Sequence, residues 1–210
     1  MSVGKSIPHD SGLGHVTGES IFIETFDKKR GNPIQPEIRN QKSEIVLRGL
    51  WQVNFLKGEP SIPQGFKTEK LDSWTKLSAD TMAQYFSGTA CYTLNFNALD
   101  NQIGKTGWLE LGDVRESAVV KLNGKVLGTT WSLPYRVPIT EGVIQKGNNK
   151  LEIEVTNLSA NRIRYMDIKA IPWRKFYDIN IVDINYRPFD ASGWLPVASG
   201  LLGDVRLITF

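Results

Sequence analysis

A turn signal between alternating apolar residues constrains the fold of this chain more than any other feature. Asn123-Gly124 directly follows a stretch in which Ala118, Val120 and Leu122 occupy every second position. Asparagine and glycine both tolerate the positive φ angles of a type I′ turn, and this pair between apolar alternations is the strongest short-range hairpin signal. The sequence therefore predicts an antiparallel β-hairpin with its turn at Asn123-Gly124.

The same two-residue period continues on both sides of this hairpin. It places one face of each strand on a core and the other face in water. The apolar positions that share this period are Leu109, Leu111, Tyr135, Val137, Ile139, Leu151, Ile153 and Val155. Pro138 interrupts one of these strands, and because proline cannot donate a backbone hydrogen bond, this strand is predicted to lie at a sheet edge.

Short strands at this spacing predict an all-β fold, an antiparallel β-sandwich of the jelly-roll kind. Further strands are expected at residues 20–25, 45–55, 85–97 and 202–210, with the first and last of these paired. Leu71, Trp74 and Leu77 have the spacing of one face of a short helix. Residues 1–19 are rich in glycine and proline and are predicted to be a flexible leader or linker, so that residues 20–210 form a single β-sandwich domain.

Composition and charge exclude several classes of function. The net charge is +3 and no run of five basic residues exists, so no nucleic-acid partner is expected. Cys91 is the single cysteine, which excludes an internal disulfide. No segment approaches the ~18 consecutive apolar residues of a membrane span. Residues 1–20 lack the apolar stretch of a signal peptide.

The sequence offers no catalytic centre. His9 and His15 are the only histidines, and both lie in the predicted leader, whereas a nucleophile–histidine pair or a zinc site needs a rigidly held imidazole. Carboxylates are present, but we interpret them as surface charges in preference to a catalytic pair. The candidates are Glu110, Asp113, Glu116, Asp167, Asp178, Asp183 and Asp190. A structural Ca²⁺ at Asp113 and Glu116 is an alternative, because calcium takes oxygen ligands from flexible turns.

Aromatic rings and arginines are concentrated between residues 131 and 194, and this segment is the functional lead. Flat rings beside polar side chains suit a sugar, whose C–H faces stack while its hydroxyls form hydrogen bonds. Tryptophan, tyrosine and arginine are also enriched in protein–protein and interdomain contacts. About half of the rings are expected in the core. The residues predicted to form a carbohydrate-binding or interdomain face are Trp131, Tyr135, Arg162, Trp173 and Trp194.

Several segments together resemble a known module. Residues 85–92 (YFSGTACY) resemble the pattern YFSGTATY, and residues 109–114 with 120–128 (LELGDV, VKLNGKVLG) resemble LDLGDV…VYVNGKxLG. Residues 131–140, residues 147–158 with Asn161-Arg162, and residues 199–205 match WKPPFRVDIT, GENxLEIEVTNLWPNR and SGLLGPV in the same way. These patterns are typical of the galactose-binding-like β-sandwich of glycoside hydrolases, of the family 2 sugar-binding-domain type. The complete set is most similar to the C-terminal part of family 106 α-L-rhamnosidases.

This resemblance implies a non-catalytic accessory module of a polysaccharide-degrading glycoside hydrolase. Its partners would be the catalytic barrel domain of the parent hydrolase and carbohydrate, and its location would be periplasmic or extracellular by analogy. The catalytic carboxylates of such enzymes lie on a (β/α)₈ barrel, which a 210-residue chain of strands cannot supply, so no catalytic residue carries over. The chain departs from the family patterns at Pro138, Ser159-Ala160 and Asp204.

Two other readings of the sequence stay open. The first is an independent, lectin-like carbohydrate-binding protein, which would expose two or three rings in one plane. The second is a self-sufficient hydrolase, which would need two facing carboxylates about 5 to 9.5 Å apart in a cleft.

Overall fold

The hairpin at Asn123-Gly124 is present in the computed structural model, which describes residues 42–175, 185 and 187–210. Strands β7 (Ser117–Leu122) and β8 (Lys125–Thr130) pair antiparallel, and both turn residues have positive φ, 53° for Asn123 and 79° for Gly124. The Asn123 side chain also accepts a 2.9 Å hydrogen bond from the backbone N–H of Lys150, and thereby ties the turn to the neighbouring strand.

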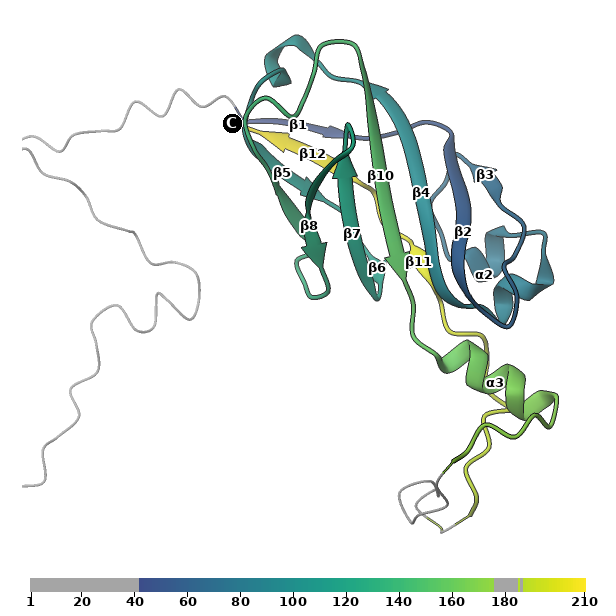
Figure 1. The fold of residues 1–210 in the computed structure, drawn as a ribbon. Coiled ribbons are helices and arrows are strands. Elements are labelled where there is room, and N and C mark those ends of the chain that lie inside the picture. Colours follow the sequence, from purple (N-terminus) through teal and green to yellow (C-terminus); the bar gives the residue numbers. More distant parts are fainter. Residues whose placement is uncertain (1–41, 176–184, 186) are drawn as a thin grey trace, which may run out of the picture. The chain divides into compact units, whose positions relative to one another are not determined.

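The described residues form an antiparallel β-sandwich with few helices (Figure 1). One sheet has six strands in the order β3-β2-β4-β10-β7-β8, and its further members are β2 (Trp51–Glu59), β3 (Phe66–Thr68), β4 (Ser87–Asn97) and β10 (Asn148–Thr156). The second sheet has the order β1-β12-β5-β9, with β1 (Ser43–Val46), β12 (Arg206–Thr209), β5 (Gly107–Glu110) and β9 (Arg136–Ile139). A short pair joins β11 (Gly200–Leu201) to β6 (Val114–Arg115).

The predicted alternation fills the core between these sheets. Leu151, Ile153 and Val155 of β10 are all fully buried, while the residues between them reach toward the outer face. Trp74, Phe55 and Phe86 meet edge to face, with ring centroids 5.0 to 5.9 Å apart. The all-β sandwich predicted from the sequence is therefore confirmed.

One local prediction is confirmed, and a second is confirmed in part, because Leu71 lies before the short helix that contains Trp74 and Leu77. Strand β9, which contains Pro138, is the edge strand of the four-stranded sheet. Trp74 lies in the short helix α2 (Trp74–Leu77), for which the Ser73 side chain accepts a hydrogen bond from the Thr75 N–H at the N-terminus. Residues 87–97 form one long strand. The short 3₁₀ helices η1 (Thr81–Gln84) and η2 (Asp100–Gln102) flank it.

The prediction of a single strand over residues 45–55 is wrong. Its two ends belong to β1 and β2, which lie in different sheets. The chain crosses between the sheets at Gly49, whose φ of 146° is accessible to glycine and strained for other residues. The strand expected at residues 20–25 and the leader at residues 1–19 lie outside the described residues. Within the described part, the last strand β12 pairs with β1.

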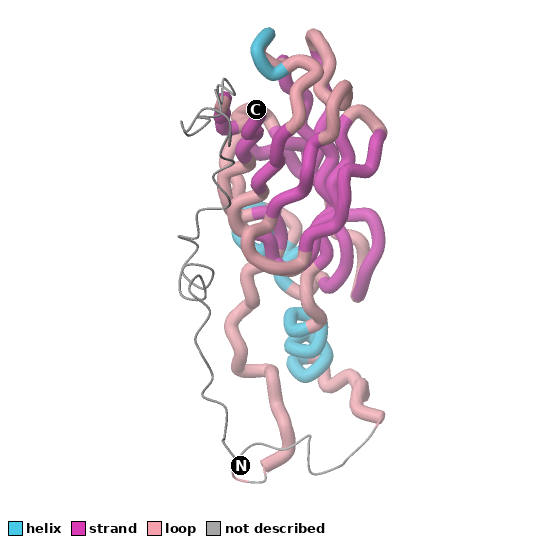
Figure 2. Tube along the Cα trace, turned by 90° about the vertical axis from the view of Figure 1, so that its left-hand side faces the viewer, coloured by secondary structure: helices cyan, strands magenta, loops and turns pink. Residues whose placement is uncertain are grey.

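The segment after β10 begins with helix α3 (Ala160–Ile168). Both views place this helix beyond the ends of the strands and not between the two sheets (Figures 1 and 2). No helix of the described residues is both long and apolar enough to cross a membrane.

Candidate functional site

The aromatic segment forms an extension of the sandwich that we call the α3 arm. It consists of α3, the following turn to residue 175, and residues 187–198, which return to β11. Three of the five predicted site residues lie on it, namely Arg162, Trp173 and Trp194. The arm begins where β10 ends and returns where β11 begins, so both of its ends are fixed to strands of the sandwich (Figure 1).

A buried polar network fixes the base of the arm. The side-chain NH₂ of Asn157 donates to the Phe86 carbonyl (2.9 Å) and to Ser199 Oγ (3.0 Å), and its Oδ1 accepts from the Gly88 N–H (2.9 Å). Asn161, one turn further, donates from Nδ2 to the Val197 carbonyl and accepts the Val197 N–H at Oδ1. These contacts join α3, the returning segment and strand β4. The family-like motif residues at these positions therefore have a structural role.

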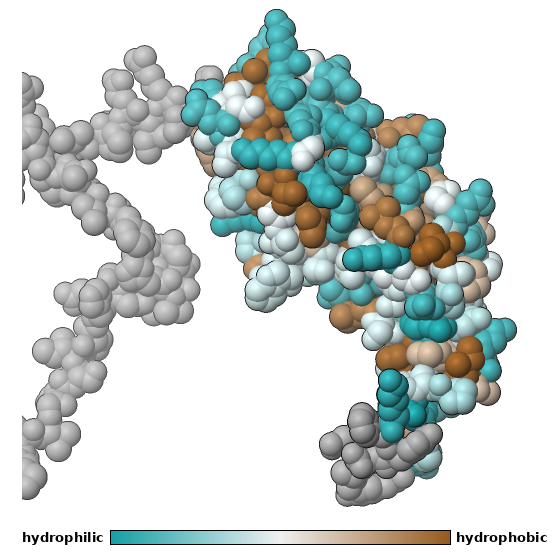
Figure 3. Space-filling model, in the orientation of Figure 1, coloured by the Kyte–Doolittle hydropathy of each residue, from teal (hydrophilic) through white to brown (hydrophobic). Residues whose placement is uncertain are grey.

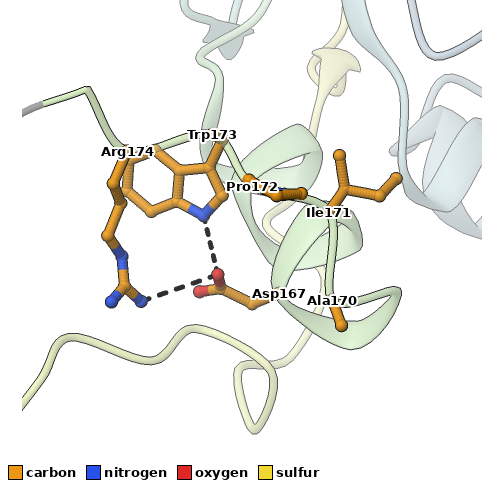
Figure 4. A pocket seen from close by; sticks show the side chains of 6 residues that line it. All are labelled: Asp167, Ala170, Ile171, Pro172, Trp173 and Arg174. Carbon is orange, nitrogen blue, oxygen red and sulfur yellow. Dashed lines mark hydrogen bonds and ion pairs between the residues drawn. The ribbon is translucent and has the colours of Figure 1, made fainter.

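A carboxylate closes the far end of the arm. Asp167 Oδ1 accepts the indole N–H of Trp173 at 2.6 Å (Figure 4). Its Oδ2 accepts the Ala191 N–H at 2.8 Å. The Arg174 guanidinium lies 3.7 Å from the same carboxylate and donates to the Phe189 carbonyl. Beside this contact lies a cavity of about 160 Å³, and it is lined by Asp167, Ala170, Ile171, Pro172, Trp173 and Arg174.

The rings of the arm pack against one another and not in one plane. The Phe189 ring lies 6.0 Å from that of Trp173 and 5.4 Å from that of Trp194, and both contacts are nearly perpendicular at 86°. Arg174 lies over Trp173 at 5.3 Å. Phe189 therefore stands between the two tryptophan rings and is nearly perpendicular to each of them.

Arg162 has a packing role within the arm. It lies over the Tyr165 ring at 5.4 Å and reaches Glu59 of strand β2 at 3.8 Å. Arg164 stacks similarly on Tyr85, and its Nε donates to the Trp194 carbonyl. One guanidinium nitrogen of each of Arg162, Arg164 and Arg174 is buried without a hydrogen-bond partner in the described part of the chain.

The arm also exposes apolar side chains to solvent. The side chain of Trp194 is 43% exposed and that of Leu195 is 85% exposed. Figure 3 shows hydrophobic residues among hydrophilic ones over this region. Large apolar side chains exposed together mark contact surfaces for ligands or partners.

Trp131 and Tyr135 lie elsewhere, in the β8–β9 loop (residues 131–135), which is well separated from α3 in Figure 1. The side chains of Trp131 and Leu133 are 74% and 78% exposed. The base of the loop is fixed: the Tyr135 carbonyl accepts the Leu111 N–H at 2.8 Å, and Tyr135 packs against the core. The structure thus divides the predicted face into two surfaces. Of the six described rings between residues 131 and 194, Tyr135 alone joins the core, fewer than expected.

The carboxylates show no catalytic or metal-binding arrangement in the described residues. Asp113 forms an ion pair with Arg115 at 2.8 Å, and no three His, Cys, Asp or Glu side chains come together there as metal ligands would. Asp190 accepts the Ser192 N–H, a hydrogen bond that lowers the pKa of its carboxyl group. Asp178 and Asp183 lie outside the described residues. The Ca²⁺ site at Asp113 and Glu116 stays a prediction.

The sequence analysis did not name Phe189, and its interpretation of Asp167 as a surface charge is wrong, because this side chain is only 10% exposed and accepts hydrogen bonds from Trp173 and Ala191. The motifs quoted from the sequence contain Asn157, Asn161 and Ser199. Their amide and hydroxyl side chains beside apolar strands were the available signal of a buried polar network. For Asp167 the spacing to Trp173 gave no signal, because this contact crosses a turn.

Comparisons with known proteins give the broader context. No protein-family model matches the chain. A curated relative, the putative β-glucuronidase of Formosa agariphila, is 36% identical over 141 residues, which are 66% of this chain and 12% of the relative. The rhamnosidase structure from Novosphingobium sp. PP1Y is 34% identical with a TM-score of 0.64, over 81% of this chain and 15% of that one.

A β-glucuronidase structure from Ruminococcus gnavus shares the fold, with a TM-score of 0.54 at 17% identity, over 85% of this chain and 30% of the other. The chain spans less than one sixth of the length of the rhamnosidase and of the Formosa relative. Over most of its length, therefore, this chain is similar to one β-sandwich part of much larger glycoside hydrolases.

Proposed function

We propose that this chain is a non-catalytic accessory module of a polysaccharide-degrading, α-L-rhamnosidase-like glycoside hydrolase, in which it supports the catalytic domain. The similarity to the rhamnosidase carries this proposal, since it covers 81% of the chain at 34% identity but only 15% of that enzyme. The carboxylates of Asp113, Asp167 and Asp190 support it as well, because each is engaged in a local contact with an arginine or a backbone N–H.

The β8–β9 loop is the docking surface in this proposal. Trp131 and Leu133 are the most exposed large apolar side chains at this end of the sandwich, and the loop that carries them is held by the core at Tyr135. A preformed loop loses little entropy on binding, and buried tryptophans are frequent hot spots of interfaces. Such a pair of side chains suits an apolar recess on the catalytic domain.

The α3 arm is the surface that contacts carbohydrate in this proposal. The side chain of Trp194 is 43% exposed, and the cavity of about 160 Å³ beside Trp173 is lined by a carboxylate and a guanidinium group that can contact hydroxyls. A cavity of about 150 Å³ accommodates benzene, so this one admits part of a sugar ring, with the rest outside it. The alternative function, an independent carbohydrate-binding protein, would use the same surface. The analogy also gives a periplasmic or extracellular location, which cell fractionation tests.

The deciding experiment combines hydrolysis and binding by the purified chain. We expect no release of p-nitrophenol from the α-L-rhamnoside or the β-D-glucuronide, and turnover that co-purifies with the chain would overturn the proposal. Binding to a panel of polysaccharides is measured in parallel with Trp194→Ala, and Trp131→Ala is the matched control. Loss of binding in the first variant alone supports the arm as the sugar contact. Equal loss in both variants would contradict the division into two surfaces.

A further inference from the structure

A second and larger cleft lies on the side of the sandwich, where three connections meet. We call it the β1–β2 cleft. It has a volume of about 370 Å³, which falls in the range of about 300 to 1,000 Å³ typical of small-molecule sites. Residues from the β1–β2 turn, from the connection after β3 and from the β11–β12 connection line it. They are Leu47, Arg48, Trp51, Glu69, Lys70, Leu71, Leu202 and Asp204.

The cleft has an apolar floor and a charged rim. Leu47 and Trp51 are buried, and Leu71 and Leu202 are partly buried. The rim side chains, Arg48, Glu69, Lys70 and Asp204, are exposed. An apolar base with a few converging polar groups is the usual composition of a site that binds an organic ligand.

Backbone contacts hold the walls in place. The Leu47 N–H donates to the Val205 carbonyl at 2.8 Å and closes one side. The Leu202 N–H donates to the Asp113 carbonyl at 2.8 Å on another. On the third, Thr68 Oγ1 donates to the Lys70 carbonyl at 2.7 Å. A ligand would therefore meet preformed walls and cause little loss of chain entropy.

The four rim charges sum to zero. Two are cationic and two are anionic, and all four side chains are exposed. An anionic ligand would be attracted by Arg48 and Lys70 but repelled by Glu69 and Asp204, and the reverse holds for a cationic ligand, so neither sign of charge is favoured. A hydroxyl group, by contrast, donates to a carboxylate and accepts from an ammonium or guanidinium group. Ligands with several hydroxyls and no charge satisfy all four side chains at once.

We propose that the β1–β2 cleft is a binding site for a neutral polyhydroxylated ligand the size of one or two sugar rings. The cleft shares no residue with the α3 arm or the β8–β9 loop. Its ligand lies over Leu71 and Leu202, while hydroxyls contact Lys70 and Asp204. The site needs neither a catalytic partner nor the carbohydrate contact of the arm.

An NMR titration of the full chain tests this site. The probes are methyl α-L-rhamnopyranoside, which is neutral, D-galacturonate, which is anionic, and D-glucosamine, which is cationic. We expect the neutral probe to shift the backbone amides of Leu71 and Leu202 and to saturate with a Kd in the range of about 1 to 10 mM. Each charged probe should bind at least about tenfold more weakly than the neutral probe.

Matched variants separate the cleft from other surfaces. Lys70→Gln and Asp204→Asn each remove one charge from an exposed rim position, so the fold is retained. Each is expected to weaken the neutral probe about tenfold or more, because a hydrogen bond to a charged group is lost. Lys67→Gln removes the same charge from the exposed face of β3, outside the cleft, and should leave binding unchanged.

Three outcomes would overturn the proposal. The first is the absence of chemical-shift changes at Leu71 and Leu202 up to about 50 mM of every probe, far above the millimolar Kd range. The second is that Lys67→Gln weakens binding of the neutral probe as much as the two rim variants do. The third is that a charged probe binds more tightly than the neutral one. Shifts confined to the arm and lost in Trp194→Ala would refute the cleft and leave the proposed function intact. Shifts confined to the cleft would support this site and remove the carbohydrate contact of the arm from the proposed function.

Discussion

Asn157 shows how one buried amide can join three parts of a fold. Its side chain satisfies the Gly88 N–H and the Phe86 carbonyl and also contacts Ser199. We expect Asn157→Ala to lower the free energy of unfolding by about 2 to 4 kcal/mol, because the buried Phe86 carbonyl and the partly buried Gly88 N–H lose their partner. Asn148→Ala, at the exposed start of β10, should change it by less than about 0.5 kcal/mol. Urea denaturation measures both, and equal effects would contradict the argument.

Tyr92 links the stability of the core to alkaline pH. Burial raises the pKa of its phenol, whose oxygen accepts the Leu201 N–H at 3.2 Å. As pH rises above about 10, the unfolded phenol ionises while the folded one keeps its proton, so stability falls by up to about 1.4 kcal/mol per pH unit. Tyr92→Phe should lower the free energy of unfolding by about 1 kcal/mol at neutral pH. The variant has no phenol to ionise at this position, so its stability should not fall in this way at alkaline pH. Urea unfolding of the parent chain and of Tyr92→Phe should give a difference in unfolding free energy that shrinks as the pH rises. A constant difference would argue against the shifted pKa.

At the scale of elements, the α3 arm is a unit whose outer half depends on Asp167. Because this carboxylate holds Trp173 and the Ala191 N–H, Asp167→Ala should release the far end of the arm. We expect amide hydrogen exchange of Ala191 and Trp194 to accelerate at least about tenfold, while strands β4 and β10 keep their protection. Asp190→Ala is the matched control, since the hydrogen bonds of this carboxylate go to the nearby Ser192 and not to Trp173 or Ala191. Acceleration across the whole sandwich would show that the arm is no separate unit.

The strands could be predicted from the sequence, whereas the arm could not. Strands with one buried face leave a two-residue period, and Asn-Gly defines its turn locally, so β7, β8, β9 and β10 were predictable. Helix α3 leaves no apolar stripe, because arginines and Asp167 alternate with its apolar residues and Asn161 is its buried member. Trp131 and Trp194 are near the two ends of one sequence segment, but the path of β9 and β10 between them separates the surfaces. Such long-range geometry has no local signal.

At the scale of the whole described sandwich, the last strand completes the four-stranded sheet. β12 lies between β1 and β5, and it buries Leu207 and Ile208 in the core. A chain that ends before Arg206 should therefore lose the four-stranded sheet and its cooperative thermal transition, as followed by near-ultraviolet circular dichroism. Phe210→Ser, just beyond β12 at a 36% exposed side chain, should leave the transition within a few degrees of the parent chain, about the size of a 0.5 kcal/mol change. A sharp transition in the shortened chain would contradict this account.

The pairing of β1 with β12 also has a consequence for synthesis on the ribosome. Glu44 and Arg206, which form an ion pair across these strands, are 162 positions apart in the sequence. At a translation rate of about 5 to 20 residues per second, roughly 10 to 30 s pass between the synthesis of Glu44 and that of Arg206. The six-stranded sheet is complete once translation has passed Thr156, but its apolar face has no finished cover until β12 is made. Newborn chains of this kind should therefore depend on holding chaperones until translation has passed Thr209.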